Sequence, residues 1–224
     1  MTRLVILALE GVLVDTVRIV AEARAEVLAK AGIETSADEL IEDFGGQGFT
    51  DILKAIEARD ALPLQASLIG EAEALVDKRL KRETRAVEGV REALAGLELP
   101  FAAVSDEPAS RVEAMLAASA LAPLFKGRTF SSAEAGLPPR PAPDILERAR
   151  GDVPASQCFV VDAFPVGIRA AGAAGMRALG FTGGEGAYPG LADRLTEAGA
   201  ETVISRLTAL PRTLAALGEW SEEG

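Results

Sequence analysis

Short apolar runs alternate with longer stretches of helical period along most of the chain. Four runs are continuously apolar and bounded by turn residues, as strands buried on both faces are: 3–9, 101–104, 157–161 and 176–181. Stretches with apolar residues at helical spacing follow, at 109–118, 145–149 and 166–174. This alternation predicts an α/β fold, a Rossmann-like doubly wound parallel sheet with helices on both faces.

One part of the chain departs from this alternation. Between residues 17 and 85 no strand pattern is found, only pieces of helical period at 17–31, 37–42, 50–59 and 64–81. We therefore predict an all-helical cap domain at 17–85, inserted after the first strand of a core domain formed by 1–16 and 86–224. An insert at that place lies over the carboxyl ends of the strands, where ligands bind in such folds.

Polar and small residues follow the predicted strands in four groups. They read Ala8-Leu9-Glu10-Gly11-Val12-Leu13-Val14-Asp15-Thr16, then Ser105-Asp106, then Arg140-Pro141-Ala142-Pro143-Asp144, and last Asp162-Ala163-Phe164-Pro165-Val166-Gly167. In this order, and with a helical insert, they resemble the four motifs of the haloacid dehalogenase superfamily. The resemblance is to its phosphoglycolate-phosphatase and β-phosphoglucomutase-like branch with a helical cap, and it covers essentially the whole chain.

The resemblance implies a site that has lost its chemistry. Ala8 stands where the family has the aspartate that attacks phosphorus, and an alanine methyl group cannot do so. Glu10 stands in place of the acid–base aspartate, and Arg140 in place of a lysine. Ala163 replaces a carboxylate that helps to hold magnesium in the family, which leaves Asp162 as a possible ligand. Magnesium binding is therefore weakened, and we expect no cofactor.

These losses predict a catalytically inactive pseudophosphatase that acts by binding a protein partner or a phosphorylated small molecule. A remnant of the phosphate site would consist of Glu10, Gly11, Ser105, Asp106 and Arg140. Alternatively these polar groups only satisfy one another, with Arg140 paired to Asp162. A hydrolase with a rearranged site, acting on a small phosphorylated metabolite, is the rival functional hypothesis, and a self-associating structural protein is the third.

Composition narrows the classes of function. The net charge of −11 is spread without a basic stripe, which argues against nucleic acid as a partner. No apolar run reaches the roughly 18–20 residues of a membrane span, so we predict no membrane association and a cytoplasmic protein. The chain has no histidine, which excludes serine–histidine catalysis and histidine–zinc sites. The single Cys158 lies in an apolar run and is expected to be buried and unpaired.

Several other polar or small residues are expected to have structural roles. Thr16 is placed to cap the helix that follows it. Gly45, Gly46 and Gly48 are expected to be hinge or turn residues. Arg111 and Arg169 lie on predicted helices and are expected to be solvated.

Overall fold

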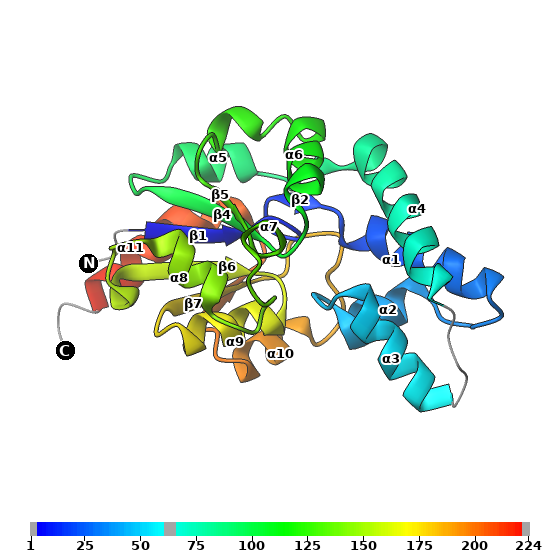
Figure 1. Ribbon diagram of the computed structural model, residues 1–224. Helices are drawn as coiled ribbons and strands as arrows, with labels where there is room; N and C mark the ends of the chain where they lie inside the picture. Colours follow the sequence, from blue (N-terminus) through cyan, green and yellow to red (C-terminus); the bar gives the residue numbers. More distant parts are fainter. Residues whose placement is uncertain (1–3, 61–65, 221–224) are drawn as a thin grey trace.

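A parallel sheet of six strands forms the centre of the computed structural model, which describes residues 4–60 and 66–220 (Figure 1). In spatial order its strands are β5 (Thr129–Ser131), β4 (Phe101–Ser105), β1 (Leu4–Ala8), β6 (Cys158–Asp162), β7 (Arg177–Phe181) and β8 (Thr202–Ile204). Strand β1 is central, with β4 and β6 parallel to it on its two sides. The α/β fold with a doubly wound sheet is therefore confirmed.

Helices cover both faces of the sheet, because its strands are apolar on both faces. Helices α5 (Val90–Ala95), α6 (Ala109–Ala118) and α11 (Leu210–Trp220) pack on one face, and α8 (Asp144–Arg150), α9 (Pro165–Ala173) and α10 (Leu191–Glu197) on the other. Alternate residues of β1 supply the two cores: Val5 and Leu7 belong to one cluster, Leu4 and Ile6 to the other. The short α7 (Ser132–Ala135) follows β5, and 3₁₀ turns lie at Ala122–Leu124, Ala155–Gln157 and Leu207–Ala209.

Helices are the only regular elements among the described residues from 16 to 84. These are α1 (Val17–Lys30), α2 (Ala37–Phe44), α3 (Phe49–Asp60) and α4 (Ser67–Glu83), which we call the helical segment. They share an apolar core of their own, with Leu28, Leu40, Ile52 and Ala72 among its buried members. Figure 1 shows the helical segment beyond the end of the sheet toward which β1 points. The division into two domains stays a prediction.

Two strands that the sequence pattern did not predict join the helical segment to the sheet. β2 (Val14–Asp15) and β3 (Arg85–Ala86) pair in an antiparallel ribbon, with Val14 opposite Ala86 and Asp15 opposite Arg85. Strands of two residues carry no periodicity, so an alternation of apolar and polar residues could not reveal them.

The prediction that Thr16 caps α1 is wrong. Thr16 occupies the position before the helix, but its side chain makes no capping hydrogen bond. Its φ and ψ of −125° and −13° lie outside the extended region that directs a capping oxygen at the helix N–H groups. Its hydroxyl is buried without a hydrogen-bond partner. By contrast, Ser36 and Glu39 form a complete capping box at the start of α2.

The remaining expectations about single elements agree with the structure where it describes them. The first predicted strand begins at Arg3 and one predicted helix at Leu64, and both residues lie outside the described range. Cys158 is buried and unpaired in β6, as predicted. None of the described helices has the length and apolar character that crossing a membrane requires.

Candidate functional site

The carboxyl ends of the three central strands meet at one edge of the sheet, and the polar residues that follow them converge there. Glu10 follows β1, Ser105 and Asp106 end and follow β4, and Asp162 ends β6. Arg140 reaches the same place from the connection between α7 and α8. The structure thus brings together the five polar side chains that the motifs predicted.

Arg140 is the centre of this cluster. Its Nη1 donates to Asp162 Oδ2 at 2.5 Å, its Nε donates to Asp106 Oδ2 at 2.8 Å, and its Nη2 lies 3.9 Å from Glu10 Oε2. Although burial opposes the charge, the three carboxylates raise the pKa of Arg140 above its usual value. The predicted pairing of Arg140 with Asp162 is confirmed, and the guanidinium faces three acids rather than open space.

Asp162 is fully buried and has both carboxylate oxygens engaged. Besides the bond from Arg140, its Oδ1 accepts the backbone N–H of Phe164 at 2.8 Å. Burial raises the pKa of Asp162, and Arg140 opposes that shift. Gly167 makes the arrangement possible, because a Cβ atom added there would lie 1.8 Å from Asp162 Oδ2.

Glu10 and Ser105 form the other half of the cluster. The Ser105 hydroxyl donates to Glu10 Oε1 at 2.5 Å and accepts the backbone N–H of Glu107 at 3.0 Å. Burial raises the pKa of Glu10 from 4.5 to about 7, against the opposing effect of Arg140. The proton of the Ser105 hydroxyl and one of its two lone pairs are thus engaged within the protein.

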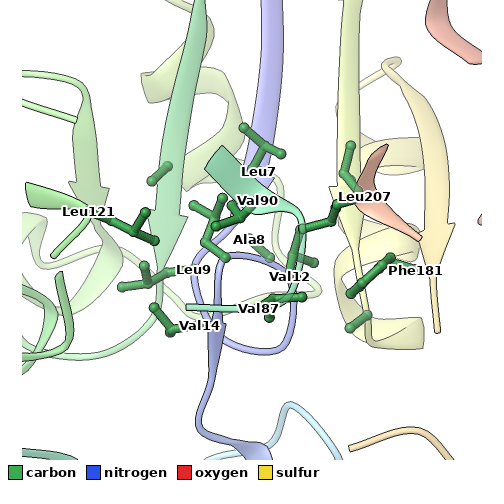
Figure 2. Close-up of a cluster of buried hydrophobic side chains, with 14 of the residues drawn as sticks. Leu7, Ala8, Leu9, Val12, Val14, Val87, Val90, Leu121, Phe181 and Leu207 are labelled. Carbon is green, nitrogen blue, oxygen red and sulfur yellow. The ribbon is translucent and has the colours of Figure 1, made fainter. Parts of the chain in front are cut away.

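The position at which the resemblance implied a nucleophile belongs to the apolar core. Ala8 ends β1 opposite Val104, is fully buried, and lies in the same cluster as Leu9, Val12 and Val14 (Figure 2). Ala163 is a buried member of that cluster as well. Methyl groups therefore fill the places where the family resemblance implied two carboxylates.

The residues present do not fit a magnesium ion. In the described part of the chain no three acidic, histidine or cysteine side chains are grouped so that they could hold a metal. Asp162, the one expected ligand, has its oxygens bonded to Arg140 and Phe164. A divalent cation there would have to displace a guanidinium that carries charge of the same sign.

The remaining parts of the predicted phosphate remnant are also occupied. Asp106 accepts the hydroxyl of Ser132 at 2.7 Å in addition to its bonds with Arg140. The backbone N–H of Gly11 donates to the carbonyl of Val14 at 2.9 Å. Gly11 itself has a φ of +78°, which glycine adopts without strain. The geometry therefore matches the alternative in which these groups satisfy one another.

A cavity of about 670 Å³ lies between this polar cluster and the helical segment. Glu10, Asp106 and Arg140 line its sheet side, whereas Phe44 and Phe49 line its helical side. Its volume falls in the range that holds small organic ligands.

Phe164 lines the same cavity and packs against the helical segment. A Cβ atom added to Gly45 or Gly46 would lie 3.0 Å from Phe164 atoms, so these glycines permit close contact with the ring. Gly46 has a φ of +80° and is a turn residue, as predicted. Phe164 and the exposed Arg169 also line a second, smaller cavity, which has a volume of about 370 Å³. The expected solvation of Arg169 agrees with its exposure.

The prediction that Arg111 is solvated is wrong. Its side chain is 8% exposed and meets three carboxylates at 2.6–2.7 Å: Glu73 and Asp77 of α4, and Glu107 after β4. Arg111 therefore ties the helical segment to the sheet. Helical periodicity indicated a face of α6 but could not identify acids more than 30 residues away as its partners.

Sequence reasoning missed Arg24 of α1, which lines the large cavity. This arginine is 9% exposed, and its guanidinium lies 5.2 Å from the centre of the Phe49 ring. A signal was available, because residue 24 falls on the helix face that also carries Val20, Ala21 and Leu28. A charged residue among apolar ones at helical spacing indicates a buried charge.

Comparison with known proteins shows the family. The haloacid dehalogenase-like hydrolase family matches residues 5–181, and the chain belongs to it. The chain is similar to a conserved haloacid dehalogenase-like protein of unknown function from Agrobacterium tumefaciens. The two are 38% identical, with 97% of this chain and 100% of that chain covered and a TM-score of 0.91.

Two further solved structures share the fold. A HAD family hydrolase from Deinococcus radiodurans, which holds phosphate and sodium, is 25% identical over 97% of this chain and 96% of that one, with a TM-score of 0.80. A predicted phosphoglycolate phosphatase from Haemophilus somnus is 17% identical over 95% and 98%, with a TM-score of 0.77. No protein with a curated description matches the sequence. The resemblance drawn from the four motifs is confirmed.

Proposed function

We propose that this protein is a catalytically inactive member of the haloacid dehalogenase-like hydrolase family that binds a small organic molecule between its sheet and its helical segment. One observation carries the proposal: at the end of β1 the side chain is the buried methyl of Ala8, within the apolar core. Covalent phosphoryl transfer to the protein needs a carboxylate oxygen at that place. Loss of a nucleophile alone typically costs about four to six powers of ten in rate.

The state of the polar cluster argues against turnover of a phosphate ester. Arg140 is engaged by Asp162 and Asp106, and Ser105 by Glu10. A phosphate group would have to compete with carboxylates already held at hydrogen-bond distance. Of the two kinds of partner that the sequence predicted, the cavity of about 670 Å³ favours a small molecule over a protein.

Residual hydrolysis is the second candidate, and Glu10 favours it. A carboxyl group whose pKa is raised to about 7 is suited to proton transfer at neutral pH. The relative from Deinococcus radiodurans holds phosphate, which supports a phosphorylated ligand. In such a site Glu10 would donate the proton, but a nucleophile would still have to come from water.

A phosphatase assay separates the two candidates. We expect no magnesium-dependent hydrolysis of p-nitrophenyl phosphate or of phosphosugars, that is, less than about one turnover per minute. The matched control is Glu10→Gln, which removes the proton donor and changes no charge elsewhere. Turnover that is present in the native protein and lost in Glu10→Gln contradicts the proposal, whereas turnover equal in both comes from a contaminating enzyme.

Restoring the lost carboxylates provides a second test. Ala8→Asp together with Ala163→Asp returns the family's residues at both positions but leaves Arg140 against Asp162. We expect no activity from this double variant, and activity only when Arg140→Lys is added. Activity in the double variant would show that the Arg140 cluster does not block the site.

A further inference from the structure

Three arginines in the described part of the chain are buried, and they differ in their partners. Arg111 and Arg140 each face three carboxylates, with hydrogen bonds of 2.5–2.8 Å to most of them. Arg24 has a single hydrogen bond, a long one of 3.4 Å from Nη1 to the carbonyl of Gln47. Its Nη2 lies 3.9 Å from Glu73, and its buried Nε has no hydrogen-bond partner.

This difference leaves Arg24 without adequate compensation for its burial. A buried cation normally has charged partners and filled hydrogen bonds, since an unpaired one is costly. Glu73 cannot serve fully, because the same carboxylate bonds Arg111 at 2.7 Å. Burial lowers the pKa of Arg24 while the charge of Glu73 only partly opposes that shift. The Nε–Nη2 edge, which is the edge that grips carboxylates in pairs, therefore lacks a direct acceptor.

The surroundings of Arg24 indicate what kind of molecule would supply that acceptor. Arg24 lines the large cavity, and its guanidinium lies over the ring of Phe49. Apolar side chains form much of the lining on this side, with Val20, Leu40 and Phe44 among them, although Asp51 and Glu73 also line it. A ligand that fits here has one anionic group and an apolar body.

Nearby acids restrict the charge of that ligand. Glu73 and Glu107 line the same cavity, as do Glu10 and Asp106 at its other side. These carboxylates would repel a phosphate dianion. A monoanion adds only one negative charge, which the poorly compensated charge of Arg24 balances. The planar guanidinium also matches a carboxylate in shape.

We propose that the cavity binds a small organic carboxylic acid, with its carboxylate on Arg24 and its apolar body against the helices α1–α3. The proposal rests on the proposed function, because it names the class of molecule that the inactive site binds. It assigns to Arg24 a role in binding and none in chemistry.

Calorimetric titration with matched probes tests the assignment. Hexanoate and 3-phenylpropionate are compared with hexanamide and 3-phenylpropionamide, which have the same apolar bodies but no charge. We expect the acids to bind about 10- to 100-fold more tightly than the amides, as charge-assisted hydrogen bonds would give. Equal affinity of acid and amide, or no binding of either acid at millimolar concentration, would overturn the proposal.

Variants assign the effect to Arg24. Arg24→Met retains a long unbranched side chain but removes the guanidinium. We expect it to weaken binding of the acids about 10- to 100-fold, with little change in the binding of the amides. The control is Arg18→Gln on the same helix, since Arg18 is partly exposed, pairs with Asp38 and does not line this cavity. Acid binding that survives Arg24→Met, or inorganic phosphate that binds as tightly as the acids, contradicts the assignment. Failure here leaves the phosphatase assay unaffected, whereas hydrolysis in that assay refutes the proposed function regardless of the acids.

Discussion

Each of the two sides of the large cavity holds a buried arginine, and the two arginines differ in how well their charge is compensated. On the sheet side, Arg140 is surrounded by Asp162, Asp106 and Glu10 and needs nothing further. On the helical side, Arg24 is equally buried, yet only a long hydrogen bond and a distant carboxylate face it. The sheet side thus holds a closed polar cluster, and our proposal places ligand recognition on the opposite wall.

The largest expected effect is the loss of Arg140. Arg140→Met would leave the fully buried Asp162 without its cationic partner, and we expect the free energy of unfolding to fall by about 3–5 kcal/mol. Urea denaturation measures it. Arg111→Met is the matched control, with a smaller loss of about 1–2 kcal/mol, because the side chains of its acidic partners are 27–48% exposed and can be rehydrated. Equal losses in the two variants would show that burial of Asp162 does not make the sheet-side cluster more costly to break than the Arg111 ion pairs.

The next effect is a pH dependence that Glu10 introduces. Its pKa is about 7 in the folded protein and near 4.5 when unfolded, so between these values the folded state binds more protons. Stability from this group therefore falls as pH rises from about 4.5 to about 7, by at most about 3 kcal/mol, and is level above that. Denaturation at several pH values should show the native protein losing stability relative to Glu10→Gln across this window. A constant difference between the two proteins would contradict the raised pKa.

A smaller effect is expected where the backbone approaches Asp162. Gly167→Ala places a methyl group 1.8 Å from Asp162 Oδ2, so the carboxylate has to move away from Arg140. We expect a loss of about 2 kcal/mol, in the range of overpacked sites. Gly172→Ala on the same helix is the control, since no atom lies within 4 Å of its added Cβ. Calorimetric melting of both variants measures the difference, and a Gly167→Ala protein as stable as the control would show that the cluster tolerates displacement.

The smallest expected effect on stability is the loss of Arg24. Because its charge is poorly compensated, Arg24→Met is expected to change the free energy of unfolding by less than about 1 kcal/mol, or to raise it. The measurement is the same urea denaturation that is used for Arg140→Met. A loss as large as that of Arg140→Met would remove the contrast between the two sides of the cavity.

The motifs identified the sheet side of the cavity because its residues follow strands. Glu10, Ser105 and Asp162 sit at or just after strand ends, and parallel strands bring such ends together without further information. Even the pairing of Arg140 with Asp162 follows from charge balance when Ala8 and Ala163 stand where the resemblance implied carboxylates. The two short strands of the ribbon and the details of the Thr16 position were out of reach, since neither has a periodic pattern.

The helical side could not be predicted in the same way. Arg24 and Arg111 acquire their surroundings from α3 and α4, which pack against them only in the folded chain. A helical pattern states that a residue faces inward or outward, but not which acid or ring it meets. The helical pattern therefore led us to predict that Arg111 is solvated, and it did not single out Arg24 as a site residue.

The ribbon of β2 and β3 has a consequence for how this chain can diversify. The helical segment leaves at Asp15 and returns at Arg85, and these two residues are paired across one ladder. A hairpin turn of two to five residues would span that gap, so the two chain connections of the helical segment lie side by side. Exchange of the helical segment would therefore replace the wall that carries Arg24 while every strand of the six-stranded sheet kept its neighbours.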